Sequence, residues 1–179
     1  MVQIGCSGFP VSRSQYFKHF SSVEITSTFY RLPRPGTIER WRKESPKDFC
    51  FSLKASQLIT HPSFSFTYKK SKLPLPAKQL AQCGHFKPSD EVFSAWEKFE
   101  ALVESLAPKF VLFQTPATFY PNGQHIQNLY KFFKSIRRPH ALLVWEARGN
   151  WPPKLIRKVC QDLGLQHGVN PLEQGSLYG

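Results

Sequence analysis

Short apolar runs, each followed by polar or turn-forming residues, recur along the chain and predict buried β-strands. The run Lys109–Gln114 is apolar almost throughout, which predicts a strand that is buried on both faces. The six strands expected from these runs are Val2–Cys6, Val23–Thr26, Phe49–Lys54, Lys109–Gln114, His140–Trp145 and Leu165–Val169.

Between the apolar runs lie segments with the three- and four-residue periodicity of amphipathic helices. The longest such segment follows Ser89, a residue suited to cap a helix, and its apolar stripe is Phe93, Trp96, Phe99, Leu102, Val103 and Leu106. The other expected helices are Ser14–Phe20, Ile38–Glu44 with Thr37 as its cap, Gln124–Lys134, and a helix that Pro152 and Pro153 open and Gly164 ends. Alternating strands and helices predict a parallel sheet with helices outside it, which both a doubly wound sheet and a (β/α) barrel satisfy.

One segment, residues 55–88, breaks the alternation. It contains four of the chain's 15 prolines and much of its positive charge. A loop of this length inside a compact domain usually forms a lid or a binding loop, or is mobile. We therefore treat residues 1–179 as a single (β/α)-barrel-like domain that carries a long basic, proline-containing loop at 55–88.

The composition is that of an ordinary globular protein, with 41% hydrophobic and 20% charged residues in 179 positions. We expect no membrane association, because no apolar run approaches the roughly 20 residues that span a bilayer. The first residues show neither the basic nor the apolar region of a signal peptide. The four cysteines are scattered without zinc spacing, so we expect free thiols and a cytoplasmic protein.

The net charge of +12 changes this picture, because the basic residues are concentrated. No acidic residue lies between Asp48 and Asp90, or between Glu104 and Glu146. The first of these stretches carries six lysines: Lys54, Lys69, Lys70, Lys72, Lys78 and Lys87. Such an imbalance favours an anionic partner, either nucleic acid or a phosphorylated small molecule, although a solvated basic surface explains it equally well.

Polar and ionisable residues follow the apolar bodies of all six expected strands. In strand order they are Ser7 and Gly8; Glu24, Thr26, Thr28 and Tyr30; Lys54, Thr60 and His61; Gln114; Glu146, Arg148 and Trp151; and His167 and Asn170. The carboxyl ends of parallel strands converge, so these residues predict one pocket. Each has a structural explanation when it is taken alone, such as a salt bridge between Glu146 and Arg148.

The segments that hold these residues resemble the domain-of-unknown-function 72 family, also called YecE-like. The similarity lies in IGCSGFP, VEITSTFYRLP, FCFSLKASQLITH, FVLFQTPATF and WEARGNW, in this order over essentially the whole chain. The resemblance implies a TIM-type (β/α) barrel with its pocket built from these segments. By matched motif it points to Glu24, Thr28, Tyr30, Lys54, Thr60, His61, Gln114, Glu146, Arg148 and Trp151.

The chain departs from the family pattern in three places. Gly8-Phe9 stands where a tryptophan is usual, and Ala147 and Gly149 stand where larger residues flank the arginine. The chain also reaches only about six βα units, whereas closed barrels need roughly 200 residues or more. We therefore expect an incomplete barrel, with parallel strands inside and helices outside, that is completed by a homo-oligomer or by a complementing C-terminal segment.

Three functional hypotheses follow. The first is an enzyme acting on an anionic substrate, with Glu24, His61 and Glu146 as acid–base groups or ligands of a divalent metal. In it Lys54 and Arg148 bind the anion, and Tyr30 and Trp151 stack on a ring. The second is a non-catalytic nucleic-acid-binding protein that uses the basic segment FSFTYKKSK, and the third is an inactive truncated relative. The sequence specifies no cofactor and does not choose between nuclease and sugar-phosphate lyase chemistry.

Overall fold

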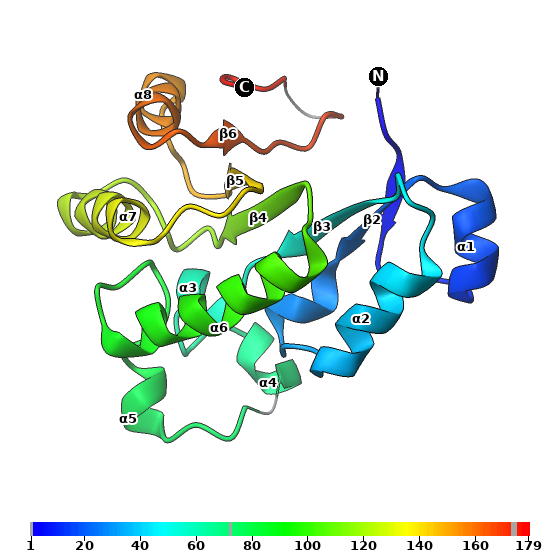
Figure 1. Ribbon diagram of the computed structural model, residues 1–179. Helices are drawn as coiled ribbons and strands as arrows, with labels where there is room; N and C mark the ends of the chain where they lie inside the picture. The colour runs from blue at the N-terminus through cyan, green and yellow to red at the C-terminus, as the bar shows by residue number, and fades with distance from the viewer. Residues whose placement is uncertain (1, 72, 173–174) are drawn as a thin grey trace.

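The computed structural model describes residues 2–71, 73–172 and 175–179, and Lys72 of the predicted basic segment lies outside these ranges. The described residues form one parallel sheet in which every strand lies beside the next strand of the chain, from β1 to β6 (Figure 1). The strands are β1 (Gly5–Ser7), β2 (Ser22–Ile25), β3 (Cys50–Lys54), β4 (Phe110–Thr115), β5 (Leu142–Ala147) and β6 (Gln166–His167). A doubly wound sheet reverses its strand order, so this order is that of a (β/α) barrel.

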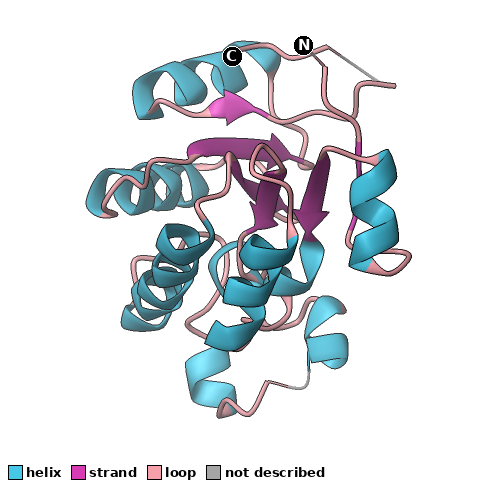
Figure 2. Ribbon diagram, turned by 45° about the vertical axis from the view of Figure 1, so that its right-hand side comes forward, coloured by secondary structure: helices cyan, strands magenta, loops and turns pink. Residues whose placement is uncertain are grey.

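Helices connect the strands and cover the outside of the sheet, as Figure 2 shows. They are α1 (Arg13–His19), α2 (Pro35–Glu44), α3 (Gln57–Thr60), α4 (Thr67–Ser71), α5 (Ala77–Leu80), α6 (Asp90–Leu106), α7 (Gly123–Ser135) and α8 (Pro153–Leu163), with a 3-10 turn, η1 (Thr26–Phe29), after β2. Among the described residues, no helix is both long enough and apolar enough to cross a membrane.

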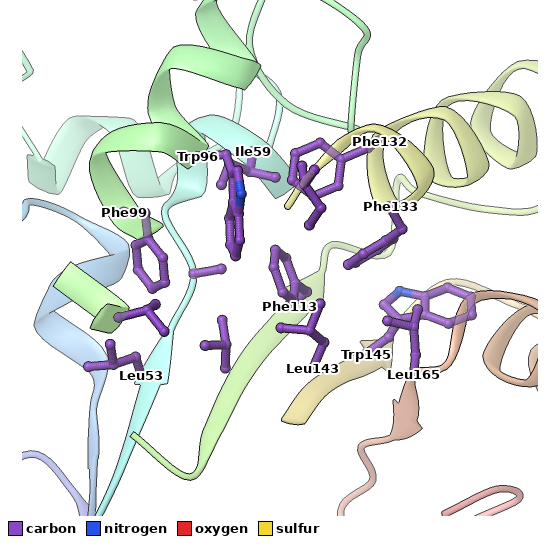
Figure 3. Close-up of a cluster of buried hydrophobic side chains, with 14 of the residues drawn as sticks. Leu53, Ile59, Trp96, Phe99, Phe113, Phe132, Phe133, Leu143, Trp145 and Leu165 are labelled. Atoms are coloured by element: carbon purple, nitrogen blue, oxygen red, sulfur yellow. The ribbon is translucent and has the colours of Figure 1, made fainter. Parts of the chain in front are cut away.

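The two faces of the sheet differ in burial because successive side chains of a strand point to opposite sides. The face toward the helices is fully buried and includes Leu53, Phe113 and Trp145. Trp96 and Phe99 of α6 and Phe132 and Phe133 of α7 pack against this face (Figure 3). The core therefore lies between the sheet and the helices.

The inner face is only half-buried, because the sheet does not close. Among the described residues, β1 and β6 are the two edge strands and do not pair with each other. Phe110 and Leu112 of β4 lie on this face and remain partly exposed. The expectation that this strand is buried on both faces is therefore wrong, since a continuous apolar run does not reveal whether a barrel closes.

The outer edge of β6 is paired with the end of the chain. Gly168 donates its N–H to Trp145 of β5, whereas the N–H of His167 points the other way and donates to the carbonyl of Tyr178 at 2.9 Å. The Ser176 hydroxyl donates to the carbonyl of His167 at 3.2 Å. Residues 176 and 178 thus satisfy the backbone N–H and carbonyl of His167, which an adjacent strand would otherwise use. The strand β6 itself is shorter than the expected Leu165–Val169.

Most helix boundaries follow the expected signals. The Ser89 hydroxyl accepts the N–H of Val92 and caps α6, and α8 begins at Pro153 and ends at a left-handed Gly164. The expected cap at Thr37 is wrong, because α2 begins two residues earlier, at Pro35. Proline is favoured at the first helical position, where its missing N–H costs nothing and its φ is already helical.

The segment at 55–88 contains the three short helices α3, α4 and α5, with α4 and α5 at the bottom of Figure 1. It returns to the barrel through a left-handed turn in which Gly84, His85 and Phe86 all have positive φ. The N–H groups of these three residues donate to the carbonyls of Leu58, Thr60 and Ile59 respectively. Gly84 is required here, because a Cβ would lie 2.2 Å from the His61 carbonyl oxygen.

Candidate active site

A chain of hydrogen bonds crosses the carboxyl ends of three neighbouring strands. The ammonium group of Lys54 donates to Gln114 Oε1 at 2.8 Å, and Gln114 Nε2 donates to Glu146 Oε1 at 2.9 Å. The Arg148 guanidinium then donates to the same carboxylate oxygen at 2.8 Å. These four predicted residues therefore form one polar network on the inner side of the sheet.

The strand register explains why these side chains meet. Gln114 and Glu146 are direct neighbours on β4 and β5, and Lys54 of β3 is the neighbour of Leu112, two positions before Gln114. Residues two positions apart point to the same face, so all three side chains leave the sheet on its half-open inner side.

Glu24 of β2 lies close enough to this network to interact electrostatically with both Lys54 and Glu146. Burial raises its pKa above the ordinary value, the attraction of Lys54 opposes this, and the repulsion of Glu146 adds to it. Glu24 also lines a cavity of about 220 Å³ that β1–β4 form on the inner face. The other ionisable or hydrogen-bonding residues of the predicted pocket, Lys54, His61, Gln114, Glu146 and Arg148, do not line this cavity.

Lys54 is held by its surroundings as well as by Gln114. Its ammonium group lies 4.8 Å from the ring centroid of Phe29, and the Thr28 hydroxyl lies 2.7 Å from the Lys54 carbonyl oxygen. Burial lowers the pKa of Lys54, while Glu24 and Glu146 oppose the shift. Thr28 is buried and contacts the Lys54 backbone, so it positions this lysine.

His61 is buried and held in one orientation. Its Nδ1 lies 2.8 Å from the Thr60 hydroxyl, and its ring packs edge-on against Phe29 at 4.8 Å. Burial, followed by the positive charge of Lys54, lowers the pKa of His61 to about 4. The imidazole is therefore neutral near pH 7 and can donate or accept a hydrogen bond without carrying charge.

The left-handed turn brings a second histidine to this end of the molecule. His85 Nε2 lies 3.2 Å from the Thr118 hydroxyl, and its ring lies 4.7 Å from that of His125. Burial lowers the pKa of His85 to about 4, and His85 in turn contributes to the low pKa of His61. No sequence pattern indicates this group of His85, Thr118 and His125, because the positive φ of His85 cannot be read from the sequence, although Thr118 does lie in the loop after a strand end.

The two predicted aromatic residues also lie outside the network. Trp151 is buried, donates its indole N–H to the carbonyl of Phe119 at 2.6 Å, and packs edge-on against Trp145. Tyr30 is half-buried with its ring against Phe29. Trp151 thus holds the loop after β4 in place, and a stacking role for either ring stays a prediction.

The described residues of the candidate site do not form a group of three metal-ligating side chains. Glu24, Glu146 and His61 are the residues that the divalent-metal alternative requires. Within the part of the chain that the structure describes, no group of three His, Cys, Asp or Glu side chains lies close enough to hold a metal ion. The chemistry that these residues offer directly is proton transfer and anion binding.

Comparison with known proteins supports the family resemblance that the sequence motifs indicate. The model of the family described as "Protein of unknown function DUF72" matches residues 12–164. The UPF0759 protein YecE of Escherichia coli K12 is 40% identical over 50 residues, which cover 28% of this chain and 18% of that protein. The UPF0759 protein YunF of Bacillus subtilis strain 168 is 28% identical over 139 residues, which cover 66% of this chain and 41% of that protein.

Solved structures of two DUF72 family proteins share the fold. The protein from Enterococcus faecalis V583 superposes with a TM-score of 0.67 at 18% identity, covering 93% of this chain and 61% of that chain. The protein from Thermotoga maritima MSB8 gives a TM-score of 0.62 at 22% identity, covering 93% and 64%. The chain thus spans less than two thirds of the length of these relatives.

Proposed function

The chain belongs to the DUF72 family. From the site at the strand ends of its open barrel, we propose that the protein is an enzyme that performs acid–base catalysis on an anionic substrate. The observation that carries the proposal is the network of Lys54, Gln114, Glu146 and Arg148 at the strand ends, with Glu24 close enough to interact with it electrostatically. Perturbed pKa values that gather at one site are characteristic of catalytic centres.

The anion would bind between Arg148 and Lys54. The Arg148 side chain is 60% exposed and uses its Nε for Glu146, which leaves its outer nitrogens directed to solvent. Two parallel N–H donors of a guanidinium match a phosphate or carboxylate, and Lys54 adds a second positive charge. Glu146 and Gln114 hold the two cations in place before the substrate arrives.

Glu24 would transfer the proton. A carboxyl group with a raised pKa is closer to the working pH and exchanges protons more readily in both directions. Lys54 next to it has a lowered pKa, so the proton affinities of the two groups approach each other. His61 would add a neutral hydrogen-bonding group on the side of β3.

We place this activity in the cytoplasm. All four cysteines are free thiols, and Cys83 and Cys160 are buried. Free thiols persist in a reducing compartment.

Turnover of two probes tests the proposal: bis(p-nitrophenyl) phosphate for phosphodiester cleavage, and ribose 5-phosphate, followed by ³¹P NMR, for sugar-phosphate chemistry. Glu24→Gln keeps the shape of the side chain but cannot transfer a proton, so we expect kcat to fall about 10²–10⁴-fold. Lys54→Met should mainly raise KM.

The matched control is Glu39→Gln on the exposed side of α2, which should leave both constants unchanged. Wild-type protein that turns over neither probe, or a Glu24→Gln variant as active as wild type, would contradict the proposal.

A further inference from the structure

Two phenylalanines face solvent in the segment that follows His61. Phe64 and Phe66 are 76% and 66% exposed, and among the described residues no other phenylalanine is exposed. Burial of a phenylalanine is worth roughly 1.5–3 kcal/mol, so leaving two of them exposed on one short segment forgoes stability. Large apolar side chains that gather on a surface usually mark a binding site.

Lysines accompany these rings. The ammonium groups of Lys69 and Lys70 lie 5.7 and 5.9 Å from the centroid of Phe66, and both lysines are exposed. No acidic residue lies between Asp48 and Asp90, so no carboxylate in this segment neutralises them. We call Phe64, Phe66, Lys69 and Lys70 the aromatic–basic patch.

The patch is built on an ordered frame. The Tyr68 hydroxyl donates to the carbonyl of His61 at 3.0 Å, and this tyrosine is partly buried. The N–H of Ser65 donates to the carbonyl of Pro62, and that of Lys69 donates to the carbonyl of Phe66. A partner that binds the patch therefore does not have to order the segment first.

We propose that the aromatic–basic patch is a docking surface for single-stranded nucleic acid. Each nucleotide offers one aromatic base that can stack and one negatively charged phosphate, which is the combination that two exposed rings and two ammonium groups recognise. The inference goes beyond the proposed catalytic activity and does not depend on it, since the two sets of residues do not overlap.

An anionic membrane surface fits the patch less well. Insertion of Phe64 and Phe66 into the lipid would take the intervening Ser65 with them, together with the local backbone. Desolvation of such polar groups costs free energy that two phenylalanines do not readily offset. A nucleic acid strand can stack on the rings while the polar groups stay in water.

Binding of a fluorescein-labelled 12-nucleotide oligo(dT) to the full chain, followed by anisotropy over a range of salt concentrations, tests the inference. Phe64→Ala with Phe66→Ala should weaken binding about fivefold or more for each ring. Phe64→Leu with Phe66→Leu should weaken it nearly as much, because leucine keeps apolar area but has no ring face. Lys69→Ala with Lys70→Ala should lower the log–log salt slope by roughly 1.4, or about 0.7 for each phosphate that the variant no longer neutralises.

The charge-matched control is Lys131→Ala with Lys154→Ala on the exposed sides of α7 and α8, which should leave the slope nearly unchanged. Glu24→Gln should bind as wild type does, so that failure of the catalytic proposal does not affect this test. The inference is overturned if the wild type fails to bind at low salt, if the control variant loses as much affinity as the patch variants, or if phosphatidylserine vesicles bind while the oligonucleotide does not.

Discussion

The two faces of the sheet are made from the same strands and have opposite roles. Toward the helices, Leu53, Phe113 and Trp145 are completely buried and form the core. Toward the barrel axis, Lys54, Gln114 and Glu146 are half-buried and bond to one another. Because the residues alternate along each strand, we infer that one face carries the stability of the fold and the other carries its chemistry.

The largest expected effect comes from comparing two phenylalanines on one strand, one on each face of the sheet. Phe113 of β4 is fully buried on the helix side, and Phe110 of the same strand is half-buried on the inner side. Phe113→Ala should lower the free energy of unfolding by about 3–5 kcal/mol, because it leaves a cavity in the core. Phe110→Ala should cost about 1 kcal/mol.

Urea unfolding of the two variants and of the wild type measures both values. The two variants are a matched pair because each carries the same substitution, phenylalanine to alanine. Equal losses would show that the inner face contributes to stability as much as the core does.

Acid should destabilise the protein through the two histidines near the polar network. The pKa values of His61 and His85 are lowered to about 4 in the folded chain, while an unfolded histidine titrates near 6.5. The folded state therefore binds fewer protons between these values, and its stability falls as the pH falls from about 6.5 toward 4. The slope reaches at most about 1.4 kcal/mol per pH unit for His61, and less for the half-exposed His85, which solvent screens.

Urea unfolding at several pH values between 4.5 and 7 gives this slope. His61→Gln should flatten it more than His85→Gln does, and His19→Gln on the exposed end of α1 is the matched control. A slope that none of these substitutions alters would place the acid sensitivity elsewhere in the molecule.

The smallest expected effect is that of Glu24→Gln, which should stabilise the protein where the preceding changes destabilise it. The raised pKa of Glu24 means that folding disfavours its ionised form, so this carboxylate destabilises the fold once the pH is above its ordinary pKa of 4.5. Glu24→Gln should therefore raise the free energy of unfolding at pH 7 by about 0.5–1 kcal/mol, and by less near pH 4. A variant that loses activity and gains stability would sharpen the contrast between the two faces, and a loss of stability at pH 7 would argue against it.

Much of the fold could be predicted because its signals are local. The apolar stripe from Trp96 to Leu106 and the pair Pro153 and Gly164 define α6 and α8 in both sequence and structure. The start of α2 differs from the prediction, since Thr37 and Pro35 are both suitable near a helix start and only packing selects between them. Burial of the inner face of β4 depends on whether the sheet closes, which no window of sequence contains.

The candidate site was predictable to the extent that it lies on strand ends. Lys54, Gln114 and Glu146 each end an apolar run, and parallel pairing then brings them together. His85 could not be found in this way, because it reaches the site through a turn whose conformation is set by hydrogen bonds to α3, far from it in sequence. Trp151 packs against the core, which a tryptophan beside a strand end can do without binding a ligand, and its stacking role stays a prediction.

The left-handed turn at residues 84–86 also bears on how this family can diversify. Its three hydrogen bonds join residues 84–86 to residues 58–60 of α3, so the chain leaves and re-enters the barrel at almost the same point. The closed excursion between them can lengthen, shorten or be exchanged for another without moving a strand, since doubling a loop costs only about 0.6 kcal/mol. One barrel can thereby carry different surface segments beside the same polar network at its strand ends, provided that the glycine at the junction is kept.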